Sequence, residues 1–158
     1  MPDNKTSDTT KSSVFNDDDS PAAFSILLGT STESTGGDPT GMISILIQDD
    51  ENHCTDRMLL RYSHTHPSAF CKGHTDLFVI SQQPSLGNLD SIEIFFNDRE
   101  NPLENPWKLR SCVVFHHENG KIYNFEIDES KSNKNTFILR AKGDPVQLIP
   151  TKLPNPFK

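Results

Sequence analysis

Eight short runs of aliphatic, β-branched and aromatic residues, each bounded by turn-forming residues, constrain the fold of this chain more than any other feature. They cover residues 24–28, 42–47, 57–62, 76–80, 91–96, 110–115, 122–127 and 136–140. The connections between them contain Gly, Pro, Asn, Asp and Ser, which favour turns. No segment sustains a helical spacing of apolar residues. The sequence therefore predicts an all-β fold, a β-sandwich of two four-stranded antiparallel sheets.

Alternation along the runs predicts which side chains enter the core, because successive side chains of a strand point to opposite faces. The expected core residues in two of the runs are Ile92, Ile94, Phe96, Tyr123, Phe125 and Ile127. The pair Asn119 and Gly120, which both tolerate positive φ, predicts a tight hairpin between 112–116 and 121–126.

Both ends of the chain are predicted to lie outside the sandwich. Residues 1–21 form an acidic Ser/Thr/Asp arm with almost no apolar residues besides Val14 and Phe15, too few to offset the entropy of ordering it. Residues 143–158 contain four prolines, which block helix and interrupt central strands. We expect a disordered arm at 1–21, a sandwich at 22–142 and an extended Pro-rich tail at 143–158.

The apolar runs and the cysteines indicate the cellular compartment of the chain. No run approaches the roughly 18 residues needed to span a bilayer, and the N-terminus does not resemble a secretory signal. Cys54, Cys71 and Cys112 stand far apart without a C-x-x-C pair, which is typical of reduced thiols. We expect a cytoplasmic protein, with peripheral attachment to a membrane as an option.

Charge and motifs exclude two functional classes. The net charge is -7 and the Lys and Arg residues do not cluster in the sequence, so we expect no nucleic-acid partner. There is no G-x-S-x-G elbow or other activated nucleophile, so we expect no enzymatic activity. His64, His66 and His74 could form a metal site, but the same residues also serve as ordinary loop residues, and the latter is favoured.

From residue 70 onward, four short motifs stand in a recognisable order. They are F-x-x-G-x-x-D-x-F at Phe70, Gly73, Asp76 and Phe78; L-G-x-L at Leu86, Gly87 and Leu89; a strand with Ile92 and Ile94; and W-x-L at Trp107 and Leu109. Val113, Tyr123 and Phe125 follow in a final hairpin. In this order and spacing the chain resembles the PLAT (LH2) domain of lipoxygenases, pancreatic-type lipases, clostridial alpha-toxin and polycystin-type proteins. The pattern is closest to the lipase type.

The resemblance implies structural roles for several motif residues. Trp107 is expected to pack against the edge of the sandwich, with membrane anchoring as the alternative. Asp76 is expected to bind loop amides, and Gly73 and Gly87 are interpreted as turn glycines. In the calcium-binding members, carboxylates flank the residue corresponding to Phe70. Here Ser68, Ala69 and Cys71 occupy those positions. We therefore expect no cofactor, and calcium binding that is weak at most.

The resemblance further implies a non-catalytic module that mediates protein–protein or membrane-lipid association. The expected docking loops contain Phe70, Leu86, Leu103 and Trp107. An acidic body is repelled by anionic lipid at about 1 kcal/mol per charge, while a buried leucine contributes about 1.5 to 3 kcal/mol. Membrane attachment should thus be weak, and a protein partner fits the composition better.

Two alternatives stay open at this stage. The chain could be the accessory regulatory domain of a lipase or lipoxygenase whose catalytic domain is absent here. It could also be an adaptor regulated by phosphorylation of the arm at Thr9, Ser12 or Ser13.

Overall fold

The computed structural model describes residues 22–34, 43–81, 83–96, 107–133 and 136–148, and these residues form strands, turns and loops without any helix. The strands are β1 (Ala22–Thr30), β2 (Ile43–Asp49), β3 (Met58–Leu60), β4 (Thr75–Ser81), β5 (Leu89–Phe96), β6 (Leu109–His116), β7 (Lys121–Ile127), β8 (Thr136–Ala141) and β9 (Val146–Gln147). Each predicted run coincides with one of the first eight strands. The all-β prediction is therefore confirmed.

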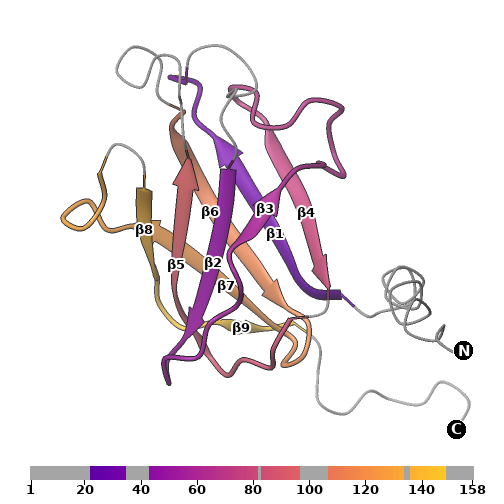
Figure 1. Ribbon diagram of the computed structural model, residues 1–158, viewed down its shortest axis with the longest axis vertical. Coiled ribbons are helices and arrows are strands. Elements are labelled where there is room, and N and C mark those ends of the chain that lie inside the picture. Colours follow the sequence, from indigo (N-terminus) through magenta and orange to yellow (C-terminus); the bar gives the residue numbers. More distant parts are fainter. Residues whose placement is uncertain (1–21, 35–42, 82, 97–106, 134–135, 149–158) are drawn as a thin grey trace, which may run out of the picture.

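The strands form two layers, as Figure 1 shows, and every pairing is antiparallel. Hydrogen bonding runs along a single path in the order β3-β2-β5-β8-β7-β6-β1-β4. Only three residue pairs join β8 to β7, from Phe125 to Ile127, and this junction divides the path into two groups of four strands. The predicted sandwich of two four-stranded sheets is confirmed, with the addition that its layers remain hydrogen-bonded at one edge.

Strand β9 lies within the segment that was predicted to be a tail. It pairs with the start of β7, Lys121 with Gln147 and Ile122 with Val146. Proline spacing does not reveal such a pairing, because it depends on where the β6–β7 hairpin lies in space. The boundaries at 21 and 142 stay predictions, since residues 1–21 and 149–158 lie outside the described part.

The core fills the space between the layers and follows the predicted alternation. Ile92, Ile94, Phe96, Tyr123 and Phe125 are buried, and Ile127 packs against them from a half-buried position. Inward side chains of β1 and β2 complete the core, namely Phe24, Ile26, Leu28, Ile43, Ile45 and Ile47. Burial of one face of each strand is the main favourable term for this fold.

The β6–β7 hairpin differs from the prediction at its turn. The last pair of the ladder is His116 with Lys121, so the loop consists of the four residues 117–120 between the predicted strands. Gly120 has φ 72°, whereas Asn119 is not among the residues with positive φ. A longer loop needs the left-handed conformation only at its end. The Asn119 side chain instead accepts a hydrogen bond from the Lys121 amide at 3.0 Å.

A buried carboxylate ties the end of β2 to the connection before β5. Asp49 is 1% exposed and accepts hydrogen bonds from the amides of Glu51 at 2.9 Å, His53 at 2.8 Å and Gly87 at 2.9 Å. The His53 ring lies 3.2 Å away. Burial raises the pKa of Asp49, but these hydrogen bonds outweigh that effect and lower the pKa to about 2.

Replacing Asp49 with Asn should therefore reduce both stability and its acid dependence. The folded-state pKa lies below the ordinary value of 3.8, so the ionised carboxylate stabilises the fold above that pH, and the stabilisation is lost as pH falls towards 2. We expect Asp49→Asn to cost about 1–3 kcal/mol at pH 7 and to flatten the decline in thermal stability between pH 4 and pH 2. Asp50→Asn, at the exposed neighbour, is the matched control. Equal acid profiles for wild type and Asp49→Asn would contradict the role assigned to this carboxylate.

Candidate functional site

Two of the four predicted docking residues lie in the aromatic part of the core. Phe70 and Trp107 are each 4% exposed. Their rings meet edge to face with centroids 5.6 Å apart, and Phe70 also stacks on Phe78 at 5.3 Å. The indole N–H of Trp107 donates to Thr30 Oγ1 at 3.0 Å. The packing interpretation of Trp107 is confirmed, and neither side chain is available at the surface.

Asp76 shapes the loop that contains Phe70. Its carboxylate is fully buried, and Oδ2 accepts the Phe70 amide at 2.9 Å. This bond holds Phe70 at φ 66°, and Gly73 in the same loop has φ 78°, a conformation that favours glycine. The predictions that Asp76 binds a loop amide and that Gly73 serves a turn are confirmed.

The three histidines considered for a metal site do not come together. His66 and His74 stack with centroids 4.1 Å apart, and His66 Nδ1 lies 3.4 Å from Asp76 Oδ1. His64 lines a different region, beside β3 and β4. Over the described ranges, no group of three or more His, Cys, Asp or Glu side chains is arranged to hold a metal ion.

Calcium binding that is weak at most stays a prediction. Asp38 and Asp98, two of its candidate ligands, lie outside the described residues. The Asp49 carboxylate is already engaged by three amides, so calcium would have to replace hydrogen bonds that hold the fold.

The other two predicted docking residues do not provide an exposed loop tip either. Leu86 is 5% exposed, and its carbonyl oxygen lies 2.9 Å from His116 Nε2. The expectation that Leu86 is free to insert into a surface is wrong, because its side chain belongs to the core. Gly87 does not have positive φ, and a Cβ there would make only ordinary contact, 3.7 Å from Asp49 Oδ2. Leu103 lies outside the described residues.

A larger apolar surface appears where no motif predicted one, on the solvent-facing side of the layer β7-β6-β1-β4. In one row across this layer, the outward residues are Leu77, Leu27, Val113 and Asn124; in the next row, they are Val79, Ser25, Phe115 and Ile122. We call the six apolar members of these rows the apolar outer face. Leu27 is 38% exposed and Val79 40% exposed, and the others are half-buried. The polar positions, Ser25 and Asn124, are uncharged.

A histidine borders this face without adding charge to it at neutral pH. The His117 ring packs against Phe115 with centroids 4.4 Å apart, and its Nε2 lies 2.8 Å from Ser25 Oγ. Burial lowers the pKa of His117 below its ordinary 6.5, and the neighbouring His116 lowers it further. His117 is therefore mainly neutral near neutral pH and adds no charge to the apolar outer face.

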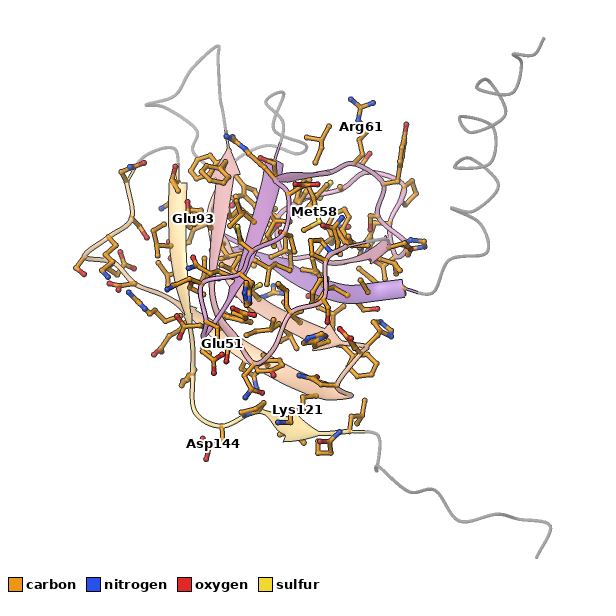
Figure 2. All side chains as sticks on the ribbon, turned by 60° about the horizontal axis from the view of Figure 1, so that its bottom comes forward. Glu51, Met58, Arg61, Glu93, Lys121 and Asp144 are labelled. Carbon is orange, nitrogen blue, oxygen red and sulfur yellow. The ribbon has the colours of Figure 1, made fainter. Side chains whose placement is uncertain are left out.

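The opposite layer treats its solvent-facing side differently. Its outward positions include Glu93 and Arg140, and Figure 2 labels Glu93 there. Arg57 covers the Phe95 ring with its guanidinium carbon 3.8 Å from the ring centroid, and Arg57 Nε donates to Ser44 Oγ at 2.8 Å. Leu46, Phe95 and Ile138 also face outward on this layer, but charged groups separate them, because Glu93 lies between Leu46 and Ile138 and Arg57 covers Phe95.

A second exposed feature lies between the two terminal strands of the path, β3 and β4. We call it the seam groove; its lining consists of Leu59, Leu60, Arg61, Tyr62, His64, Phe78, Val79 and Ile80. Tyr62 is 79% exposed and Leu59 41% exposed. Figure 2 shows the Arg61 side chain pointing away from the strands.

The described part of the chain contains no helix long and apolar enough to cross a membrane.

Comparisons with known proteins identify the fold. No family model and no curated protein sequence matches the chain. A lipoxygenase variant, also solved in complex with arachidonate, superposes with a TM-score of 0.61 and 17% identity, over 77% of this chain and 17% of that one. A coral 8R-lipoxygenase, described as activated by calcium through a C2-like domain, gives 0.54 and 13% over 75% of this chain and 16% of that one.

A calcium-dependent 11R-lipoxygenase gives a TM-score of 0.53 with 14% identity, over 77% of this chain and 17% of that one. The chain therefore spans about a sixth of the lipoxygenases that it matches. Preference for the lipase type stays a prediction, since these structures are all lipoxygenases. The PLAT fold, the C2-like β-sandwich found within lipoxygenases, is the fold of this chain.

Proposed function

We propose that this chain is a non-catalytic docking module whose apolar outer face binds the surface of a second protein domain. The observation that carries the proposal is the composition of the two rows, in which the six apolar side chains span four strands. Antiparallel sheets usually place polar residues on a solvated face. Contiguous exposed apolar patches mark interaction sites.

The free energy gained by burying the apolar outer face indicates the kind of partner that it can bind. Leu27 and Val79 retain only 38% and 40% of their exposure, so covering each one adds about 1 kcal/mol or less. The six side chains together contribute a few kcal/mol, which falls short of the translational and rotational cost of tight association between free proteins. A weakly held partner, or a domain tethered nearby at high effective concentration, suits this surface.

A tethered partner would also fit the interpretation of this chain as an accessory domain. In the lipoxygenases that share this fold, the matched region occupies 16–17% of a much longer chain. A domain of that kind has a neighbour within reach and needs only modest burial to dock on it. We therefore retain, as a form of this proposal, that the face docks on a catalytic domain and regulates it.

Photo-crosslinking tests the face directly. A photoreactive phenylalanine analogue at Val79 of the full chain, expressed in its cells of origin, should crosslink to one discrete protein or domain. The same analogue at Glu93, on the opposite layer, is the matched control and should not. Leu27→Lys should weaken binding of the captured partner at least tenfold, because burying an unpaired charge opposes docking.

Two outcomes would contradict this function. One is an identical set of crosslinks from Val79 and Glu93, which would mean that contact is nonspecific. The other is unchanged affinity for the captured partner in Leu27→Lys with thermal stability preserved.

Exposure of Tyr62 favours a second candidate function, association with the anionic surface of a membrane. Tyr62 is the most exposed of the large hydrophobic side chains in the described part, and tyrosine suits an interface that is apolar on one side and wet on the other. The stretch 61–75 carries Arg61 and Lys72 and contains no Asp or Glu. This local charge opposes the repulsion expected from the net charge, and it would place the chain at the periphery of a membrane, in the cytoplasm.

Binding to lipid vesicles shows whether the positive charge of the stretch 61–75 or the negative net charge of the chain governs membrane association. Under this second function, adding phosphatidylserine to phosphatidylcholine vesicles should increase co-sedimentation, since each basic residue near the surface contributes about 1 kcal/mol. High salt should remove the increase. Tyr62→Ser should lower binding to both kinds of vesicle, with Tyr123→Phe as a control at a buried tyrosine. Weaker binding to phosphatidylserine vesicles than to neutral ones would show that the net charge governs, and would exclude this function.

A further inference from the structure

The hydrogen-bonded path of strands ends at two edges that do not pair with each other. Strand β3 pairs with β2, and β4 pairs with β1. At its start, the outer edge of β4 is covered by the loop that precedes it. The His64 amide donates to the Leu77 carbonyl at 2.8 Å, and Thr65 Oγ1 accepts the Leu77 amide at 3.2 Å.

Beyond Leu77 the outer edge of β4 has no such cover. Residues two apart on a strand direct their amide and carbonyl groups to the same edge, so those of Val79 point into the seam as those of Leu77 do. No residue within the described ranges forms a hydrogen bond with them. An open strand edge of this kind is a template for another extended segment.

The seam groove beside this edge has an apolar floor and a cationic rim. Leu60 and Phe78 at its floor are buried, and Ile80 is half-buried. Arg61 supplies the positive charge of the rim, and the groove lining includes no Asp or Glu. An extended segment that combines one large apolar residue with adjacent carboxylates would match both properties.

We propose that residues 13–19 of this chain, in the N-terminal arm, occupy the seam groove as an additional edge strand beside β4. The segment reads Ser-Val-Phe-Asn-Asp-Asp-Asp. Phe15 covers the floor at Phe78 and Ile80, and the run Asp17–Asp19 faces the cationic rim. It is the only stretch of residues 1–21 in which a large aromatic side chain adjoins an acidic run.

The chain is long enough for this arrangement. Ala22, the first residue of β1, pairs with Ser81 at the end of β4, so the arm leaves the sandwich next to the uncovered edge. Phe15 lies seven positions before Ala22, a reach of up to about 23 Å. From Ala22, the groove opposite Val79 is about 7 Å away along the direction of β4 and about 10 Å away in the direction across the strands. Pro21 lacks an amide hydrogen and so favours a turn away from β1 at this point.

This inference goes beyond the proposed function, because the seam groove shares only Val79 with the apolar outer face and its proposed occupant belongs to the same chain. Occupation of the groove would cover the open edge of β4 at Val79. It would also place Ser13, within the arm, at a position where an added phosphate alters the charge of the inserted segment.

Amide hydrogen exchange of the full chain, followed by NMR, tests the proposal. The Val79 amide should be protected in the wild type, and Phe15→Asp should speed its exchange at least tenfold while the core amide of Val114 is unaffected. Thr10→Asp adds the same charge to the arm outside residues 13–19 and should leave Val79 protected. Arg61→Glu should also reduce the protection, because it reverses the charge of the rim.

Three results would overturn the proposal. Val79 could exchange as an unprotected amide in the wild type, which would mean that the edge is open. Its protection could survive Phe15→Asp, which would assign the cover to something other than the arm. Protection that rises with protein concentration and is insensitive to Phe15→Asp would identify a second copy of the chain as the occupant.

Discussion

Each strand of a two-layered sandwich can bury only one of its two faces, and the properties of this molecule depend on how its outer faces meet water. The inner faces supply an aliphatic and aromatic core that includes Ile26, Ile45 and Ile94, all without exposure to solvent. The layer containing β5 and β8 places charged residues such as Glu93 and Arg140 among the apolar residues of its outer side. The layer containing β1 and β6 instead exposes Leu27 beside Val113. This difference between the layers is the physical basis for assigning docking to one of them.

The residues that carry the resemblance to PLAT domains act inside the fold. Asp76 holds the left-handed Phe70 through its amide, and Trp107 reaches Thr30 through the indole N–H. These contacts stabilise loops and the aromatic core, so substitutions there would be expected to affect stability before recognition. The surfaces suited to binding consist of residues outside those motifs, such as Leu27, Val79 and Tyr62.

Much of the fold could be predicted from the sequence because alternation is local. The period of two along 91–96 identifies Ile92 and Ile94 as core residues, whereas the bond from Asp76 to a loop amide was implied by the resemblance to PLAT domains. Pairings between distant segments could not be predicted in this way. Asp49 binds Gly87, which is 38 positions further along the chain, and the seam exists because β3 and β4 happen to end the path.

The candidate site was harder to predict for the same reason. Leu86 was expected at a loop tip because its neighbours are turn residues, yet it is buried. The apolar outer face joins Leu27, Leu77 and Val113 across three strands that are separated in sequence. Each of these residues alone reads as an ordinary strand residue. Only the register of the sheet shows that they form a continuous surface.

Side-chain footprinting with a photoactivated carbene would test the central claim most directly, by comparing the purified chain with the same chain labelled inside intact cells. If the apolar outer face docks on another domain, labelling of Leu27, Val113 and Phe115 should fall severalfold in cells, whereas labelling of Phe95 and Ile138 on the opposite layer should not change. Equal labelling of Leu27, Val113 and Phe115 in both settings would show that this face stays open to solvent and would contradict the account.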